Sequence, residues 1–300
     1  MAQKRHLVIG AIIVVLFLLA LGFFALMFIS LAMGGGDFEL LGVGGNVGVV
    51  EVFGLLDESL GRTVIEDLDR WKDTRSIRAI VLHVNSPGGG VAISQEIYDA
   101  VNRAREMKPV VVSMASVAAS GGYYIACPAD LIVANPGTIT GSIGVIMQFY
   151  TASGLMEKIG IGQETVKSGE LKDVGSLARE MSGEERLMLQ SVIMDTHEQF
   201  VAAIAEGRGL DEDVVRPLAD GSIYSGHQAY NLGLVDTLGG LNEAVEIAAE
   251  LADISGEPKV VRPYKRREVT IFDLLGGLFS GVSKAVSRPQ GGPELLYLYQ

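Results

Sequence analysis

A long run without any charged side chain, Leu7–Met33, constrains this sequence more than any other feature. As a helix it would reach roughly 40 Å at about 1.5 Å per residue, which exceeds the hydrocarbon thickness of a bilayer. Lys4 and Arg5 precede the run, and no basic residue follows it until Arg62. By the positive-inside rule, we expect a cytoplasmic N-terminus (residues 1–6), a transmembrane signal anchor (7–33) and an extracytoplasmic remainder.

The alternative is a cleaved signal peptide, in which Ser30 and Ala32 would form a small-x-small cleavage site. We favour the uncleaved anchor, because the apolar run is longer than the roughly 7 to 15 residues usual in a signal peptide.

Charge and cysteine content narrow the classes of partner. The whole chain has 24 basic and 36 acidic residues, and without Lys4 and Arg5 the remainder carries 22 − 36 = −14. This balance argues against nucleic acid and polyanionic partners. The single cysteine, Cys127, cannot form an internal disulfide, and the apolar residues before it predict a buried structural thiol. With no CxxC or clustered His/Cys spacing, we expect no metal or other cofactor.

The region after the anchor alternates between two kinds of pattern. Residues 34–46 are glycine-rich and predict a linker. Apolar runs predict strands at Val47–Phe53, Ile77–Val84, Pro109–Met114 and Leu131–Ala134. Helical spacing predicts helices at Val91–Glu106, Ser182–Gly207 (where Ser182 and Glu185 have capping-box spacing) and Leu241–Ala252. Strands that alternate with helices indicate an α/β fold with mostly parallel strands, which we place at residues 47–255.

Residues 256–300 form a separate C-terminal extension in this interpretation. Lys259–Arg267 is basic, and Ile271–Val286 is amphipathic if helical. A membrane-surface contact would use both features, but the interrupting glycines favour an ordinary packed helix. The last eight residues, PELLYLYQ, fit either an apolar strand or a disordered end. One hypothesis is that Tyr297–Gln300 binds as a strand in the subunit's own groove.

Two short segments could carry chemistry. Asn85–Gly90 (NSPGGG) follows a predicted strand and precedes a helix, so its glycines let backbone N–H groups approach a ligand. Ser120, in AASGGYYIA, lies where another strand ends and a helix can begin, which is where open α/β sheets bind ligands. The N–H groups of Gly121 and of the Gly88–Gly90 turn would then suit an oxyanion.

A serine nucleophile needs a base, and the residues alone leave that base open. His6 precedes the anchor, and His83, His197 and His227 are better explained as structural or surface residues. A lysine serves if burial and neighbours lower its pKa toward neutrality. The lysines near TVKSGELKDVGS are Lys158, Lys167 and Lys172.

Five motifs in order, between about Val47 and Ala252, resemble the signal peptide peptidase A family of peptidase S49, whose members are Ser-Lys proteases. They are NSPGGG, SVAASGGYYIA, TGSIGVI, KSGELKD and ADGSIYSGHQAYNLGLVDTLGG. The resemblance implies a ClpP/crotonase-like α/β spiral fold. It also implies a homo-octameric ring whose subunits share active sites, as in the short members of the family.

The resemblance assigns residues as well. Ser120 matches the nucleophile, Lys172 the general base and Ser142 the serine that orients the lysine amine. Gly89 and Gly121 match the oxyanion N–H donors. The implied activity is degradation of remnant signal peptides and other unstructured apolar peptides at the membrane, without a cofactor.

Three alternatives stay open at this stage. One is an S49 protease that acts on a stomatin-like membrane partner, and another is a ring scaffold without catalytic activity. The third is a crotonase-type acyl-CoA enzyme, since a fold does not fix a function. Retention of Ser120, Lys172 and Ser142 together favours the protease.

Overall fold

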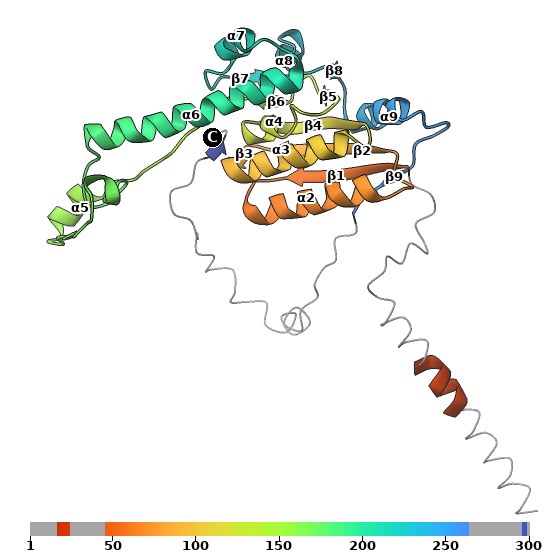
Figure 1. Cartoon of the computed structure of the whole chain (residues 1–300), viewed down its shortest axis with the longest axis horizontal. Coiled ribbons are helices and arrows are strands. Elements are labelled where there is room, and N and C mark those ends of the chain that lie inside the picture. Colours follow the sequence, from red (N-terminus) through yellow and green to blue (C-terminus); the bar gives the residue numbers. More distant parts are fainter. Residues whose placement is uncertain (1–16, 25–45, 264–295, 299–300) are drawn as a thin grey trace, which may run out of the picture. The chain divides into compact units, whose positions relative to one another are not determined.

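A computed structural model describes residues 17–24, 46–263 and 296–298 of the 300-residue chain (Figure 1). The chain divides into two compact units, Met1–Gly44 and Gly45–Gln300. Residues 17–24 of the first unit are helical. Within the described ranges, no helix combines the length and the apolar character that a membrane crossing needs. Most of the predicted anchor at 7–33, nearly all of the predicted linker at 34–46 and the segment Ile271–Val286 lie outside those ranges, so these predictions stay untested.

The second unit is built on one large sheet. Its main path runs β7-β6-β4-β2-β1-β9, and β5 pairs with both β4 and β8. All these pairings are parallel except β6 with β7. The sheet strands are β1 (Val47–Phe53), β2 (Ala79–Ser86), β4 (Val110–Ala119), β5 (Leu131–Ala134), β6 (Ile139–Gly141), β7 (Ile223–Ser225), β8 (Thr237–Leu238) and β9 (Val260–Val261). A separate two-stranded antiparallel pair joins β3 (Gly88–Gly90) and β10 (Leu296–Leu298).

Helices cover both faces of the sheet, which explains why its strands are apolar on both sides. In β1, Val50 and Val52 contribute to the larger core, whereas Val47 and Val49 contribute to a second core formed with α9. Figure 1 shows α2 and α3 together, and α9 apart from them. The helices are α2 (Glu58–Asp73), α3 (Val91–Arg105), α4 (Gly121–Tyr124), α5 (Ser153–Lys158), α6 (Gly183–Arg208), α7 (Glu212–Val215), α8 (Gly226–Asn231) and α9 (Leu241–Leu251), with short 3-10 turns η1 (Glu170–Asp173) and η2 (Arg216–Leu218).

The α/β architecture and the parallel sheet confirm the fold class expected from the sequence. The strands predicted at 47–53 and 131–134 have the observed bounds, and β4 continues five residues beyond the predicted end, up to Ala119. The α6 capping box is present, with Ser182 and Glu185 bonded reciprocally, but the helix ends at Arg208, with Gly209 as its C-cap, rather than at Gly207. Helix α2 was not predicted, and β9 joins the sheet from the predicted extension.

Helix α6 has two different halves. Its second half is buried against the body through Phe200, Val201 and Ile204, whereas Glu185 is the one buried residue before Thr196. Figure 1 shows the first half extending past the sheet toward α5. We call residues 147–194 the arm. Large apolar side chains are exposed on it, including Tyr150, Leu155 and Leu187 at 77%, 62% and 73%.

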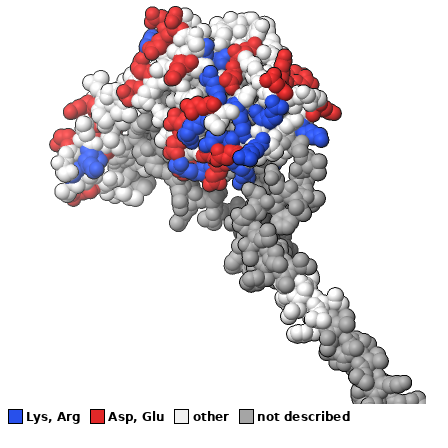
Figure 2. Space-filling view, turned by 45° about the vertical axis from the view of Figure 1, so that its right-hand side comes forward, with Lys and Arg blue, Asp and Glu red and all other residues white. Residues whose placement is uncertain are grey.

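Acidic and basic side chains are intermingled on the face of the molecule shown in Figure 2. Many pair locally, as Arg62 does with Glu58 and Glu96. Exposed pairs of this kind contribute little to stability, so the fold depends mainly on the two apolar cores.

Candidate active site

Ser120 occupies the sharp turn between β4 and α4. Its backbone has φ 54° and ψ −119°, a region that side-chain-bearing residues rarely adopt. The conformation is fixed from both sides. Ser120 N donates to Gly141 O at 2.8 Å, and Ser120 O accepts from the N–H groups of Tyr123 and Tyr124, each at 2.9 Å. A serine held in a strained strand-to-helix turn is the arrangement that presents the nucleophile in α/β hydrolases.

The Ser120 hydroxyl is buried and has no hydrogen-bond partner among the described residues. A buried hydroxyl normally finds one, because an unmade hydrogen bond costs about 1 to 3 kcal/mol. The residues after it are well fixed: Tyr123 is fully buried, and its hydroxyl donates to Leu234 O at 2.8 Å. The structure thus holds Ser120 rigidly while leaving its reactive oxygen unsatisfied.

The two glycines proposed as oxyanion donors lie next to each other. A methyl group placed on Gly121 would lie 3.2 Å from Gly89 N and 2.8 Å from Ser94 Oγ. A methyl group on Gly89 would lie 2.1 Å from Leu56 O. These close approaches explain why both positions carry glycine, and they show that the backbone at Gly121 packs directly against that of Gly88 and Gly89.

One edge of β3 accepts a further strand. Gly88 O and Gly90 N bond to Leu56, each at 2.8 Å, so Gly89 directs its N–H and C=O to the opposite edge. That edge is where β10 pairs antiparallel, with Tyr297 opposite Gly89. The pairing of Tyr297 and Leu298 agrees with the hypothesis that the C-terminal segment binds as a strand, and residues 299–300 lie outside the described ranges.

Ser142 is brought beside Ser120 by strand pairing. In the β4/β6 register Ala119 pairs with Gly141, so Ser120 and Ser142 each follow directly on a paired residue. Neighbouring strands lie about 4.8 Å apart, which sets the scale of the separation between the two backbones. Ser142 also has a positive φ of 49°, and its N–H donates to Ser222 O at 2.7 Å.

A cleft of about 570 Å³ opens beside Ser142. Its apolar wall includes Val145, Ile193 and Met194, and its polar lining includes His197. The His197 Nε2 donates to Ala219 O at 2.7 Å, since a carbonyl can only accept, and Nδ1 is buried without a partner. The sequence interpretation treated His197 as structural and gave no sign that it shares a cleft with Ser142.

Lys172 lies in the 3-10 turn η1 on the arm, with an exposed side chain. Within the described residues its ammonium group makes no hydrogen bond or ion pair. Lys167 differs: its Nζ donates to Asp173 Oδ1 at 2.9 Å, and this bond raises the pKa of Lys167. Of these two lysines, Lys172 is therefore the one free to act as a base.

Within the chain, Lys172 lies apart from Ser120. The turn that carries Lys172 is bonded through Asp173 and Arg179 to Glu185, near the start of α6. Phe200, about 22 Å farther along that helix, packs on Tyr124 at 5.0 Å between ring centroids. The structure therefore brings together Ser120, Ser142, Gly89 and Gly121, and leaves Lys172 on the arm.

Three further groups considered as nucleophile or base are engaged elsewhere or lie at the surface. His83 Nδ1 lies 3.2 Å from Ser113 O, and burial lowers the pKa of this histidine. His227 is exposed at the start of α8. Cys127 is buried, its Sγ donates to Tyr124 O at 3.0 Å and burial raises the pKa of its thiol, so the expected structural thiol is confirmed.

Comparisons with known proteins identify the family of this chain. The profile of peptidase family S49 matches residues 102–255, and that of Clp protease matches residues 47–133. The Synechocystis protein slr0021, named as a candidate protease, is 42% identical over 228 residues, which cover 76% of this chain and 82% of that protein.

Two further relatives are longer than this chain. The chloroplastic serine protease SPPA of Arabidopsis thaliana is 33% identical over 225 residues, which cover 74% of this chain and 33% of the relative. Protease 4 of Salmonella typhi is 37% identical over 211 residues, which cover 70% of this chain and 34% of the relative. The chain is a protease of peptidase family S49, in its signal peptide peptidase branch.

Proposed function

We propose that the protein is a membrane-anchored serine endopeptidase in which Ser120 is the nucleophile and Lys172 the general base. The observation that carries the proposal is the Ser120 hydroxyl, which is buried without a partner on a strained turn beside Gly89 and Gly121. A rigid hydroxyl beside two closely packed glycines, whose N–H groups are suited to bind an oxyanion, supports acyl transfer.

The reaction follows from these roles. Neutral Lys172 takes the proton from Ser120 Oγ, and the oxygen attacks a peptide carbonyl. The N–H groups of Gly89 and Gly121 hold the tetrahedral oxyanion, while Ser142 orients the lysine amine. Lys172 then protonates the leaving amine, and a water molecule activated by the same lysine hydrolyses the acyl-enzyme.

We propose that the lysine acts on the serine of a neighbouring subunit in a homo-octameric ring. In one chain both groups lack partners, since Ser120 Oγ is buried and unpaired and Lys172 is exposed on the arm. The apolar side chains exposed on the arm support burial against a second copy. The cleft beside Ser142 has room for an incoming lysine side chain.

The substrates we propose are remnant signal peptides and other unstructured apolar peptides, bound as extended strands. The edge of β3 opposite Leu56 pairs with an antiparallel strand of the chain itself, which supports this mode of binding.

We propose further that residues 7–33 anchor the protein, with the N-terminus in the cytoplasm and the protease domain outside. Protease treatment of spheroplasts tests the topology, and a C-terminal tag that is digested only after lysis would contradict it.

The catalytic proposal is tested with Ser120→Ala and Lys172→Ala, using an unstructured apolar-rich peptide. Each variant should lose activity while keeping its assembly. Mixed subunits of the two inactive variants should then recover about one quarter of wild-type activity, the chance that an intact serine meets an intact lysine in a random ring. Full activity of Lys172→Ala would refute the base, and no recovery in verified mixed rings would refute the shared site.

A further inference from the structure

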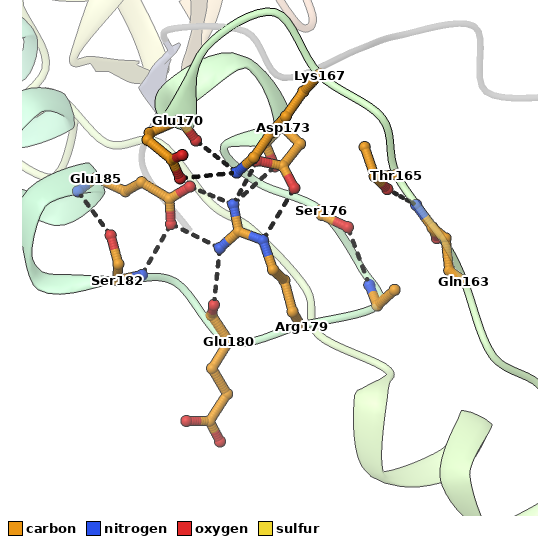
Figure 3. A network of polar contacts seen from close by, with 11 residues as sticks. Gln163, Thr165, Lys167, Glu170, Asp173, Ser176, Arg179, Glu180, Ser182 and Glu185 are labelled. Carbon is orange, nitrogen blue, oxygen red and sulfur yellow. Dashed lines mark hydrogen bonds and ion pairs between the residues drawn. The ribbon is translucent and has the colours of Figure 1, made fainter.

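A charged cluster surrounds the turn that carries Lys172. Figure 3 shows Lys167, Asp173, Arg179 and Glu185 pointing toward one another from the arm and the start of α6. We call the segment Glu170–Asp173 the lysine turn. Nothing in the proposed reaction uses this cluster, although it contacts the residues on both sides of Lys172.

Lys167 holds the lysine turn at both ends. Its Nζ donates to the backbone Glu170 O at 2.7 Å and to Asp173 Oδ1 at 2.9 Å. The turn itself is closed by Lys172 N, which donates to Gly169 O at 3.1 Å. The backbone of residue 172 is therefore fixed even though its side chain is exposed.

Arg179 connects the lysine turn to α6. Its Nε donates to Asp173 Oδ2 at 3.0 Å and its Nη2 to Asp173 Oδ1 at 2.7 Å, a bidentate contact. Its Nη1 donates to Glu185 Oε2 at 2.8 Å, and its Nη2 also bonds Glu185 Oε1. A planar guanidinium is the side chain best suited to bridge two carboxylates in this way.

Glu185 is a firm anchor for that bridge. Its side chain is 2% exposed, and Oε2 also accepts from Ser182 N at 2.8 Å in the α6 capping box. A buried carboxylate with this many donors is held in one orientation. Arg179 therefore fixes the lysine turn to the N-terminal end of α6.

We propose that Arg179 is a positioning residue for the base: by bridging Asp173 and Glu185 it fixes the lysine turn on α6, so that Lys172 is presented to the serine it serves. The inference rests on the proposed function, since it assumes that Lys172 is the base. It matters because a base displaced by about 1 Å can cost 100-fold in rate.

The bridge has a second consequence for Lys172, which directly precedes Asp173. The charged groups that contact the Asp173 carboxylate are Lys167 and Arg179, which also pair with Glu170 and Glu185, respectively. Arg179 and Lys167 donate to the two carboxylate oxygens and compensate the charge of Asp173, and Arg179 is the donor to Oδ2. Removing Arg179 leaves Asp173 as a less compensated negative charge close to Lys172, which favours the protonated form of the amine and weakens it as a base.

The bridge stays charged throughout the pH range in which a lysine base works. Hydrogen bonds from Arg179 hold the pKa of Asp173 well below its ordinary value and that of Glu185 at about 2. Depressed carboxylate pKa values stabilise the folded state above the unfolded values near 4, and the gain is lost only in acid. Titration of Asp173 or Glu185 therefore does not contribute to a rate profile measured between pH 6 and about 10.

The test compares Arg179→Ala and Arg179→Lys with Arg216→Ala. Arg216 also bridges two carboxylates, those of Glu198 and Glu212, but it lies outside the arm. For Arg179→Ala we expect kcat to fall about ten-fold or more at pH 8 with KM within about two-fold. The rising limb of kcat against pH should move up by about one unit. Arg179→Lys should recover part of kcat, and Arg216→Ala should match wild type.

A double variant separates the effect of the Asp173 charge from the effect of losing the Arg179 bridge. Asp173→Asn in the Arg179→Ala background removes the released carboxylate, so the rising limb should return toward its wild-type pH while kcat stays low. If Arg179→Ala does not fold, the test uses the single variant Asp173→Asn. This variant should lower kcat and leave the rising limb of kcat against pH at its wild-type position. An unchanged kcat in whichever variant folds, with Lys172→Ala inactive, overturns the positioning role alone. Activity in Lys172→Ala instead overturns the proposed function on which it rests.

Discussion

The turn that carries Ser120 and the lysine turn are held by different forces. Ser120 lies within the body, where backbone hydrogen bonds from β6 and α4 and the buried Tyr123 fix it. Lys172 lies on the arm, whose anchor is a set of ion pairs around Asp173 and Arg179. One half of the proposed site is therefore part of the folding core, and the other half is a surface feature held by charge.

This difference indicates how the two halves should respond to change. Packing and strain tolerate almost no alteration at the nucleophile, because a small displacement meets backbone atoms on several sides. Ion pairs on a projecting arm can be altered without unfolding the body, so their loss should affect activity more than stability. The predictions below test that contrast.

The largest effect is expected for Gly89→Ala. The new methyl group would lie 2.1 Å from Leu56 O, so β3 must shift and carry the Gly89 N–H away from Ser120. Loss of one oxyanion donor lowers kcat about 100- to 1,000-fold, and we expect a loss in this range. Steady-state kinetics on the apolar-rich peptide measure it.

Gly90→Ala is the matched control for that change. Its methyl group would lie 3.3 Å from Ile93 Cγ2 and 3.7 Å from Leu56 O, and the residue has an ordinary φ of −59°. We expect activity within about three-fold of wild type, since a shift of a few tenths of an ångström relieves the closer contact. Similar losses in Gly89→Ala and Gly90→Ala would show that the β3 edge does not hold the oxyanion.

The second prediction concerns the arm. Leu187→Asp places a charge on a side chain that is 73% exposed in the single chain. If the arm packs on a second copy, the charge must be desolvated there, and the assembly should dissociate with about ten-fold loss of activity. Sedimentation velocity measures the assembly. Met107, 69% exposed but outside the arm, is the control, and dissociation by Met107→Asp to the same extent would contradict the role of the arm.

The sequence predicts the body of this protein better than its site. Strand β5 is an uninterrupted apolar run and β1 contains a single charged residue, Glu51, so their bounds follow from burial on both faces. The end of β4 was missed because Ala118 and Ala119 are small and carry no strong strand signal. Helix α2 was missed although Val64, Leu68 and Trp71 form its buried stripe, because charged residues separate them.

The candidate site divides in the same way. AASGG and NSPGGG mark turns whose backbone demands are visible in the residues themselves, and the structure places them together. No local pattern distinguishes Lys167 from Lys172. The difference arises from Asp173, which pairs with Lys167 and with the more distant Arg179. From the sequence, Arg179 is indistinguishable from an ordinary solvated arginine, because its partners Asp173 and Glu185 are identified only by the structure.

The third prediction uses pH to separate strong and weak ion pairs. Arg179 lowers the pKa of Glu185 from 4.5 to about 2, so its stabilisation is present above pH 4.5 and is lost as the pH falls toward 2. The difference in melting temperature between wild type and Glu185→Gln should therefore shrink from pH 7 to pH 3. Glu198→Gln removes an exposed partner of Arg216 and should change the melting temperature little at either pH. The same dependence of melting temperature on pH in both variants would contradict the distinction between strong and weak ion pairs.

The smallest effect is expected at β10, where the chain itself occupies the edge of β3. Tyr297 lies opposite Gly89, so Tyr297→Pro removes an N–H that faces β3, whereas the N–H of Leu296 points away from it. A displaced internal strand no longer competes with substrate, and KM should fall about two-fold in Tyr297→Pro with kcat unchanged. Leu296→Pro is the control and should leave KM near wild type. Equal KM values in all three proteins would mean that β10 does not occupy the edge that substrate uses.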